Sequence, residues 1–167
     1  MIKTFNSLFV TMLGLGKIKF IPGTFGSLAT TIILYYLFHK LNIAHNIILI
    51  ILIIIFIYSF YAVSSHIENS DDKDPGEIII DEFLGQSIPI FLYEISHGTT
   101  KDGYEAIIYY TIFFILFRYF DIMKPFPVSY FDRNFKNSFG IIMDDICAGF
   151  YVVVTLVCFI IIKSYVL

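Results

Sequence analysis

Residues 46–64, NIILIILIIIFIYSFYAVS, form an uncharged run dominated by isoleucine, and this run decides the fold class. At about 1.5 Å of rise per residue, a helix of this length spans the roughly 30 Å hydrocarbon core of a bilayer. The whole chain has a matching composition, because 57% of its 167 residues are hydrophobic and 15% are charged, with a mean hydropathy of +0.79. A soluble domain carries about 25% charged residues. The composition therefore excludes a soluble globular enzyme and favours a membrane protein.

Four further apolar stretches flank this run, at residues 25–38, 78–93, 106–120 and 141–162. Pro22 and Gly23 precede the first of them and can open a helix there. Stretch 78–93 either spans the membrane or re-enters it, because Asp81, Glu82 and Gln86 lie near its start. The sequence predicts an all-α, polytopic membrane helix bundle of four or five transmembrane helices. Residues 1–167 are expected to form this single integral-membrane domain.

The cations are distributed unequally between the two ends of the predicted bundle. If all five stretches span, eight cations share the side of the N-terminus and three lie on the other side, namely Lys40, Lys101 and Lys163. Lys and Arg are enriched in cytoplasmic loops, so the N-terminal side is predicted to face the cytoplasm. Eleven of the fourteen acidic residues lie on that side as well. The chemically interesting residues thus converge on one face of the membrane.

Three other classes of sequence feature carry no function here. A formal charge of −3 offers no attraction to nucleic acid, so no nucleic-acid partner is expected. Cys147 and Cys158 form no CxxC pair and are interpreted as small apolar residues. Residues 1–10 are too short for a removable secretory signal.

Five carboxylates lie at the cytoplasmic edge of the predicted bundle: Asp81, Glu82, Asp121, Asp144 and Asp145. An Asp at the centre of a membrane helix costs about 2.5–3.5 kcal/mol and less near the interface, so such groups need partners. Neighbouring basic side chains cannot neutralise so many carboxylates, whereas a divalent cation can. Oxygen ligands without His or Cys favour Mg²⁺ over Zn²⁺.

Phosphate-binding features accompany these carboxylates. Thr24 and Ser27 lie in a glycine-rich stretch at a predicted helix N-terminus, where free N–H groups can bind an anion; a helix cap is the simpler interpretation of that stretch alone. Arg118, Lys124 and Arg133 supply cations, and Pro125 and Pro127 stiffen the chain beside Lys124. Together with Mg²⁺, these residues suit phosphoryl transfer on a membrane-borne phosphate.

Several motifs in order give the chain a family resemblance. They are Pro22-Gly23-Thr24-Phe25-Gly26-Ser27, Asp74-Pro75-Gly76-Glu77, Asp81-Glu82 with Gly85-Gln86, Phe120-Asp121 with Lys124-Pro125, Phe131-Asp132-Arg133, and Gly140-Ile141 with Asp144-Asp145 and Ala148-Gly149. With these motifs the chain resembles the phosphatidylglycerophosphatase A family over about residues 14–149. The resemblance implies a Mg²⁺-dependent enzyme of the bacterial inner (plasma) membrane, which hydrolyses the anionic phospholipid phosphatidylglycerol phosphate to phosphatidylglycerol.

From this resemblance and the residues we derive a hypothesis for the site. Asp81, Glu82, Asp144 and Asp145 are expected to bind Mg²⁺, and Asp121 to orient or deprotonate the attacking water. Lys124, Arg118 and Arg133 are expected to stabilise charge on the phosphate, with Thr24 and Ser27 as further phosphate ligands. Glu82 and Asp145 must then lie no more than roughly 15 Å apart, because bonds to Mg²⁺ are only ~2 Å long.

Two other functional classes compete with a phosphatase. A small ion transporter or channel subunit would line a cation path with intramembrane acids, but at several depths rather than at one edge. A non-enzymatic assembly factor would tolerate Asn or Gln in place of its acidic residues.

Overall fold

The computed structural model describes residues 2–68, 75–97 and 103–166, and these residues form α-helices and one short 3₁₀ helix but no strand. The predicted all-α class is therefore confirmed. The elements are α1 (Ile2–Val10), η1 (Leu15–Lys17), α2 (Pro22–His39), α3 (His45–Ile67), α4 (Ile80–His97), α5 (Gly103–Met123), α6 (Val128–Asn134) and α7 (Ser138–Val166).

The five apolar stretches correspond to α2, α3, α4, α5 and α7, as the hydrophobic pattern predicts. Helix α2 begins at Pro22, with proline in its first turn, because proline needs no hydrogen-bond partner for its nitrogen there. Helices α1 and α6 were not predicted. They have nine and seven residues, too few for an apolar run to reveal them.

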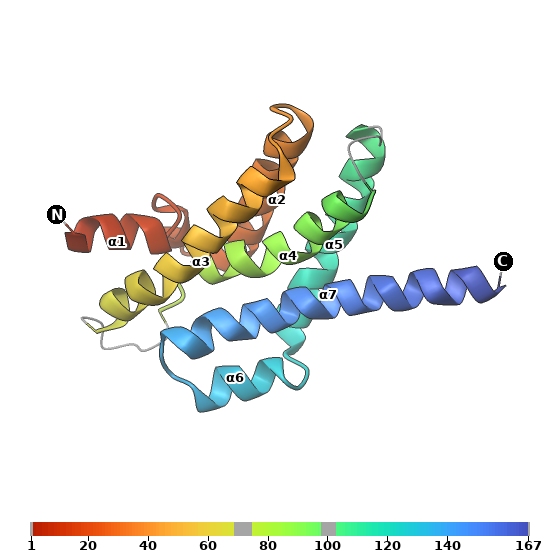
Figure 1. The fold of residues 1–167 in the computed structure, drawn as a ribbon. Helices are drawn as coiled ribbons and strands as arrows, with labels where there is room; N and C mark the ends of the chain where they lie inside the picture. The colour runs from red at the N-terminus through yellow and green to blue at the C-terminus, as the bar shows by residue number, and fades with distance from the viewer. Residues whose placement is uncertain (1, 69–74, 98–102, 167) are drawn as a thin grey trace.

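Helix α4 forms the core of the bundle (Figure 1), where it packs against both α2 and α7. Its side chains are buried on several faces, as shown by Leu84, Gln86 and Ile90. A helix that is buried all round needs apolar neighbours on every side, and the surrounding helices supply them. The polar residues at the start of α4, Asp81 and Glu82, are consequently partly buried.

The outer helices expose apolar side chains, as expected of a surface that faces lipid. Among the described residues, three helices are long and apolar enough to cross a membrane: His45–Ile67, Tyr104–Met123 and Ser138–Tyr165. Helices α2 and α4 are not among them, so the predicted count of four or five spans is not confirmed. Both helices have 18 residues and include Gly, Ser, Thr or acidic side chains, which lower their hydropathy.

The two ends of the bundle collect different polar groups. At one end, Glu94 of α4 is 3% exposed. It accepts a hydrogen bond from the hydroxyl of Tyr110 in α5 at 3.0 Å, and it lies 3.1 Å from Nε2 of His39 in α2. These contacts join three helices at that end. The N-terminal ends of α2, α4 and α7 and the C-terminal end of α5 meet at the other end, which holds the predicted site residues.

Candidate functional site

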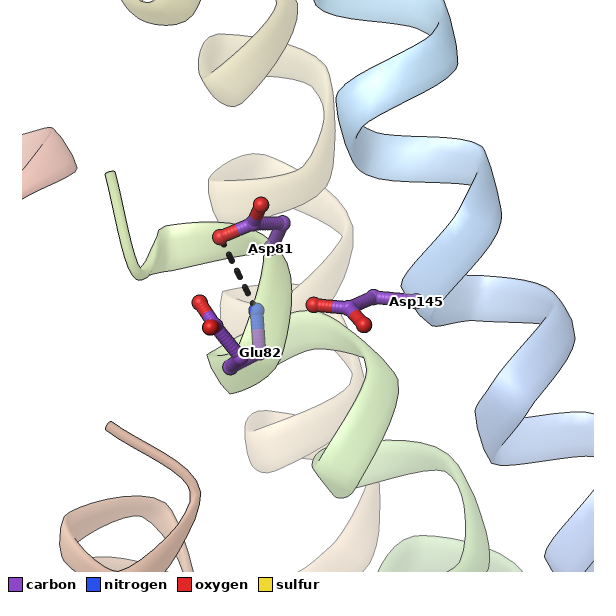
Figure 2. Close-up of side chains that lie close together, drawn as sticks. All are labelled: Asp81, Glu82 and Asp145. Carbon is purple, nitrogen blue, oxygen red and sulfur yellow. Dashed lines mark hydrogen bonds between the residues drawn. The ribbon is translucent and has the colours of Figure 1, made fainter. Parts of the chain in front are cut away.

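Three carboxylates from two distant parts of the chain meet where α4 and α7 begin (Figure 2). Asp81 and Glu82 lie in the first turn of α4, and Asp145 lies in the second turn of α7. One ligand oxygen from each lies within 4.8 Å of the others. Glu82 and Asp145 therefore satisfy the proximity that the sequence hypothesis requires.

Two oxygens of the cluster find no hydrogen-bond donor in the part of the chain that the structure describes. Among the described residues, Glu82 Oε2 and Asp145 Oδ1 are buried without a hydrogen-bond partner, whereas Asp81 Oδ1 accepts a hydrogen bond from the backbone N–H of Glu82 at 3.1 Å. Buried carboxylates without partners are costly, and three together also repel one another. A divalent cation with oxygen ligands would supply the missing charge, so the donor set fits Mg²⁺.

Helix α5 adds an arginine and a further carboxylate to this cluster. Arg118 Nη1 pairs with Asp121 Oδ2 at 2.9 Å and donates to Ser27 Oγ of α2 at 3.3 Å. Asp121 in turn interacts electrostatically with Glu82 and Asp145. Arg118 Nε is buried without a partner among the described residues, so its guanidinium retains donor capacity toward an anion.

Lys124 lies between two carboxylates at the edge of the cluster. Its Nζ atom is 2.6 Å from Asp132 of α6 and 3.0 Å from Asp144 of α7. Partial burial acts against the charged form, but the hydrogen bond to Asp132 and the charge of Asp144 raise the pKa of Lys124 above its usual range. Lys124 is therefore a fixed, protonated cation beside the three carboxylates.

Asp144 has different surroundings from Asp145, its neighbour in α7. One of its oxygens pairs with Lys124, and the other accepts the backbone N–H of Asp145 at 2.9 Å. Asp144 is not in the group of three that share a 4.8 Å neighbourhood. It connects the carboxylate cluster to Lys124.

The remaining predicted residues lie at the periphery or outside the described part. Ser27 Oγ donates to the Gly23 carbonyl at 2.8 Å as well as accepting from Arg118. Thr24 is partly exposed in the first turn of α2, and Arg133 is exposed near the end of α6. Asp74, the first residue of the Asp74-Pro75-Gly76-Glu77 motif, lies outside the described residues.

Comparison of the sequence with known proteins assigns the chain to a family. The family model described as phosphatidylglycerophosphatase A matches residues 8–160. The chain belongs to the phosphatidylglycerophosphatase A family.

Individual relatives agree with this membership. The chain is 36% identical over 141 residues to a phosphatidylglycerophosphatase A of Haemophilus influenzae, covering 84% of this chain and 80% of the relative. It is 30% identical over 136 residues to that of Escherichia coli, covering 81% and 72%. A Bacteroides thetaiotaomicron protein named "Putative phosphatidylinositol-3-phosphatase" is 32% identical over 144 residues, covering 84% of each chain. No solved structure matches.

Membership of the phosphatidylglycerophosphatase A family confirms that the chain is an enzyme, a phosphatase. The transporter alternative receives no support from these relatives. The acids that are close together at one end of the bundle, rather than spread along its length, are in keeping with the enzyme.

The sequence hypothesis gave Asp132 no role in the site, although it belongs to the Phe131-Asp132-Arg133 motif. Partial burial opposes the effect, but the hydrogen bond from Lys124 lowers the pKa of the Asp132 carboxyl. The stabilisation that Asp132 contributes is present above about pH 3.9, the pKa of an unfolded Asp. It is lost as pH falls through the lower pKa of the folded state. The stabilisation that Lys124 contributes is present below about pH 10.4, the pKa of an unfolded Lys, and is lost only above that pH. The ion pair is therefore unchanged between about pH 5 and 9.

We expect Asp132→Asn to lower the melting temperature of the detergent-solubilised protein equally at pH 7 and pH 9. Both groups of the pair are partly exposed, so the loss is about 1 kcal/mol, or about 2–4 °C. Arg133→Gln on the same helix serves as the control, because that side chain is exposed. A loss present at only one of the two pH values would contradict the assigned charges.

Proposed function

We propose that this protein is a membrane-bound, Mg²⁺-dependent phosphatase that hydrolyses phosphatidylglycerol phosphate to phosphatidylglycerol and phosphate. The observation that carries the proposal is the close approach of two partly buried carboxylates, Asp81 and Glu82, and the buried Asp145, with two cations nearby, Arg118 and Lys124. A phosphomonoester needs such a combination, since its charge must be neutralised while a water molecule attacks phosphorus. Family membership supports phosphatase chemistry at this site.

Asp81, Glu82 and Asp145 would hold the magnesium, with Asp144 beside them. When bound, Mg²⁺ would supply Lewis-acid stabilisation of charge on the phosphate oxygens. Two buried carboxylate oxygens that accept no hydrogen bond from the described part of the chain support this assignment, because an ion would satisfy them. The absence of His or Cys from this group of ligands favours a hard cation.

The protein's own side chains divide the remaining work. Arg118 and Lys124 would bind phosphate oxygens, and the carboxylates that pair with them hold their charged groups in place. Asp121 would accept a proton from the water as its oxygen attacks phosphorus. The bond from phosphorus to the glycerol oxygen then breaks, and that oxygen would take up the proton that Asp121 accepted and leave as an alcohol.

The proposed location is the bacterial inner membrane, with the site facing the cytoplasm. Three apolar helices support insertion in a bilayer. The site lies at the end of the bundle that also holds Lys124, Arg133 and Lys136, in accordance with the enrichment of cations in cytoplasmic loops. The substrate would therefore present its head group to the site from the cytoplasmic leaflet.

The decisive experiment is an assay of phosphate release by the purified protein in mixed micelles. The substrates are phosphatidylglycerol phosphate, phosphatidylinositol 3-phosphate and phosphatidic acid, each with Mg²⁺ or with EDTA. We expect release from phosphatidylglycerol phosphate with Mg²⁺, loss of activity in EDTA and recovery when Mg²⁺ is restored. Preference for another lipid would overturn the head-group assignment, and activity that persists in EDTA would overturn the metal assignment.

A further inference from the structure

Helix α1 carries an apolar face that no described part of the chain covers. Ile2, Phe5 and Leu8 are 66%, 60% and 43% exposed. At 3.6 residues per turn they lie within an arc of about 120° on one side of the helix. The buried residues Asn6 and Val10 lie on the adjacent side of the helix, beyond Ile2. An amphipathic helix of this kind suits the boundary between lipid and water.

The contacts of α1 place this face next to the apolar surface of α3. The hydroxyl of Tyr58 in α3 donates to Asn6 Oδ1 at 2.7 Å, and the rings of Phe5 and Phe9 contact the Tyr58 ring at centroid distances of 6.2 and 4.8 Å. Helix α3 exposes Ile57 and Tyr61 on the same stretch. The exposed face of α1 is thus continuous with the apolar surface of a helix that can span a membrane.

The loop after α1 combines exposed cations with exposed apolar side chains. Five consecutive residues are exposed: Lys17, Ile18, Lys19, Phe20 and Ile21. Leu13, at the preceding turn, is 86% exposed. Cations interleaved with apolar side chains match an anionic lipid surface, which offers phosphates above and acyl chains below.

This surface is also joined directly to the site. The carbonyl of Val10, the last residue of α1, accepts the backbone N–H of Ile79 at 2.9 Å, two residues before Asp81. Gly16 packs so closely against the backbone of Glu77 that a β-carbon there would overlap its carbonyl oxygen. Residues 10–16 therefore hold the segment that leads into the carboxylate cluster.

We propose that residues 2–21 form an anionic-lipid-binding surface that lies in the head-group layer and positions the entrance of α4 beside it. The proposal rests on the membrane location given under the proposed function. Its occupant is the head-group layer of a bilayer that contains anionic phospholipid. The charges of Lys17 and Lys19 and the continuity with the α3 surface favour lipid over a second protein.

The chain contains no tryptophan, so a single introduced tryptophan reports its own surroundings. We expect Phe5→Trp and Phe20→Trp, in the full chain in vesicles with 30 mol% phosphatidylglycerol, to be quenched by lipids brominated near the head group and protected from aqueous iodide. Ile54→Trp on the outer face of α3 is the lipid control, and Glu68→Trp at the exposed end of α3 is the water control.

The two controls separate the possible failures. If Phe5→Trp and Phe20→Trp respond to iodide as Glu68→Trp does, while Ile54→Trp responds to brominated lipid, the inference is overturned and the membrane location stands. If Ile54→Trp also fails to respond to brominated lipid, the membrane location itself fails. Protection from both quenchers would show that protein covers the surface, and this too would overturn the inference. Phe5→Tyr and Phe20→Tyr change the side chains less. Nitration of the tyrosines at these two positions, in vesicles, gives a second measurement of their exposure to water.

The role of charge has its own test. A lysine near an anionic surface favours the bound state about fivefold, since it contributes about 1 kcal/mol. In Phe20→Trp protein, we expect quenching by brominated lipid to fall when phosphatidylglycerol is replaced by phosphatidylcholine. The Lys17→Gln, Lys19→Gln double variant should remove this dependence on anionic lipid, whereas Lys40→Gln at the other end of the bundle should retain it. Equal quenching in both lipids would overturn the anionic specificity.

Discussion

Asp145→Asn should lower Mg²⁺-dependent phosphate release about 10²- to 10³-fold, the size of effect seen when a group that stabilises transition-state charge is removed. Asn has nearly the same shape as Asp but carries no charge. Asp145 is the member of the cluster that α7 contributes, opposite the two carboxylates of α4. In the proposed metal site, its loss would leave the ion with Asp81 and Glu82 on one side only. Steady-state phosphate release at saturating MgCl₂ measures the effect.

A second measurement on Asp145→Asn distinguishes a metal ligand from a structural residue. Without Mg²⁺ the variant should melt no lower than the parent protein, because it relieves repulsion among three crowded carboxylates. Added Mg²⁺ should raise the parent's melting temperature and have a much smaller effect on the variant, since a ligand at 100 times its Kd stabilises by about 2.7 kcal/mol. Glu105→Gln, at the far end of α5, is the control. Stabilisation of Asp145→Asn equal to that of the parent would remove Asp145 from the metal site.

The long helices could be predicted because their apolar side chains follow one another without interruption. Residues 46–64 identify α3 within a few residues of its bounds. The pattern could not decide how many helices span, since α4 owes its helical state to burial among its neighbours rather than to its own hydropathy. It also could not reveal α1, whose apolar residues alternate with Lys3, Thr4 and Asn6.

The site shows a similar division between what a sequence reveals and what it conceals. Acidic residues inside apolar stretches are costly, and this cost identified five carboxylates that need a cation: Asp81, Glu82, Asp121, Asp144 and Asp145. The structure places three of them, Asp81, Glu82 and Asp145, within 4.8 Å of one another. Adjacent residues on a helix point about 100° apart, so Asp144 and Asp145 cannot both face α4. Which of the two faces α4 depends on how α7 packs, and the sequence alone does not give this. That rotation directs Asp145 toward α4 and Asp144 toward Lys124. The partner of Lys124 on α6, Asp132, depends on a short helix that the pattern missed.

The close crossing of α4 and α7 depends on two glycines, and a single methyl group should disrupt it. A β-carbon at Gly149 would overlap the carbonyl oxygen of Gly85, and one at Gly85 would overlap the carbonyl oxygen of Asp145. Gly149 follows Asp145 by one helical turn. Any widening at this crossing therefore moves Asp145 away from the carboxylates of α4.

Gly149→Ala should lower phosphate release about 10²-fold, the cost of a displacement of about 1 Å in a catalytic group. It should also destabilise the protein by about 1–3 kcal/mol, because the backbone atoms at the crossing must separate. Gly76→Ala is the same substitution at a position where no heavy atom lies within 4 Å of the added carbon, and we expect it to change neither quantity. Activity assays and melting curves of the two variants make the comparison. Equal activity in both would show that the carboxylates tolerate a wider crossing, and the site would then owe its geometry to something other than helix contact at these glycines.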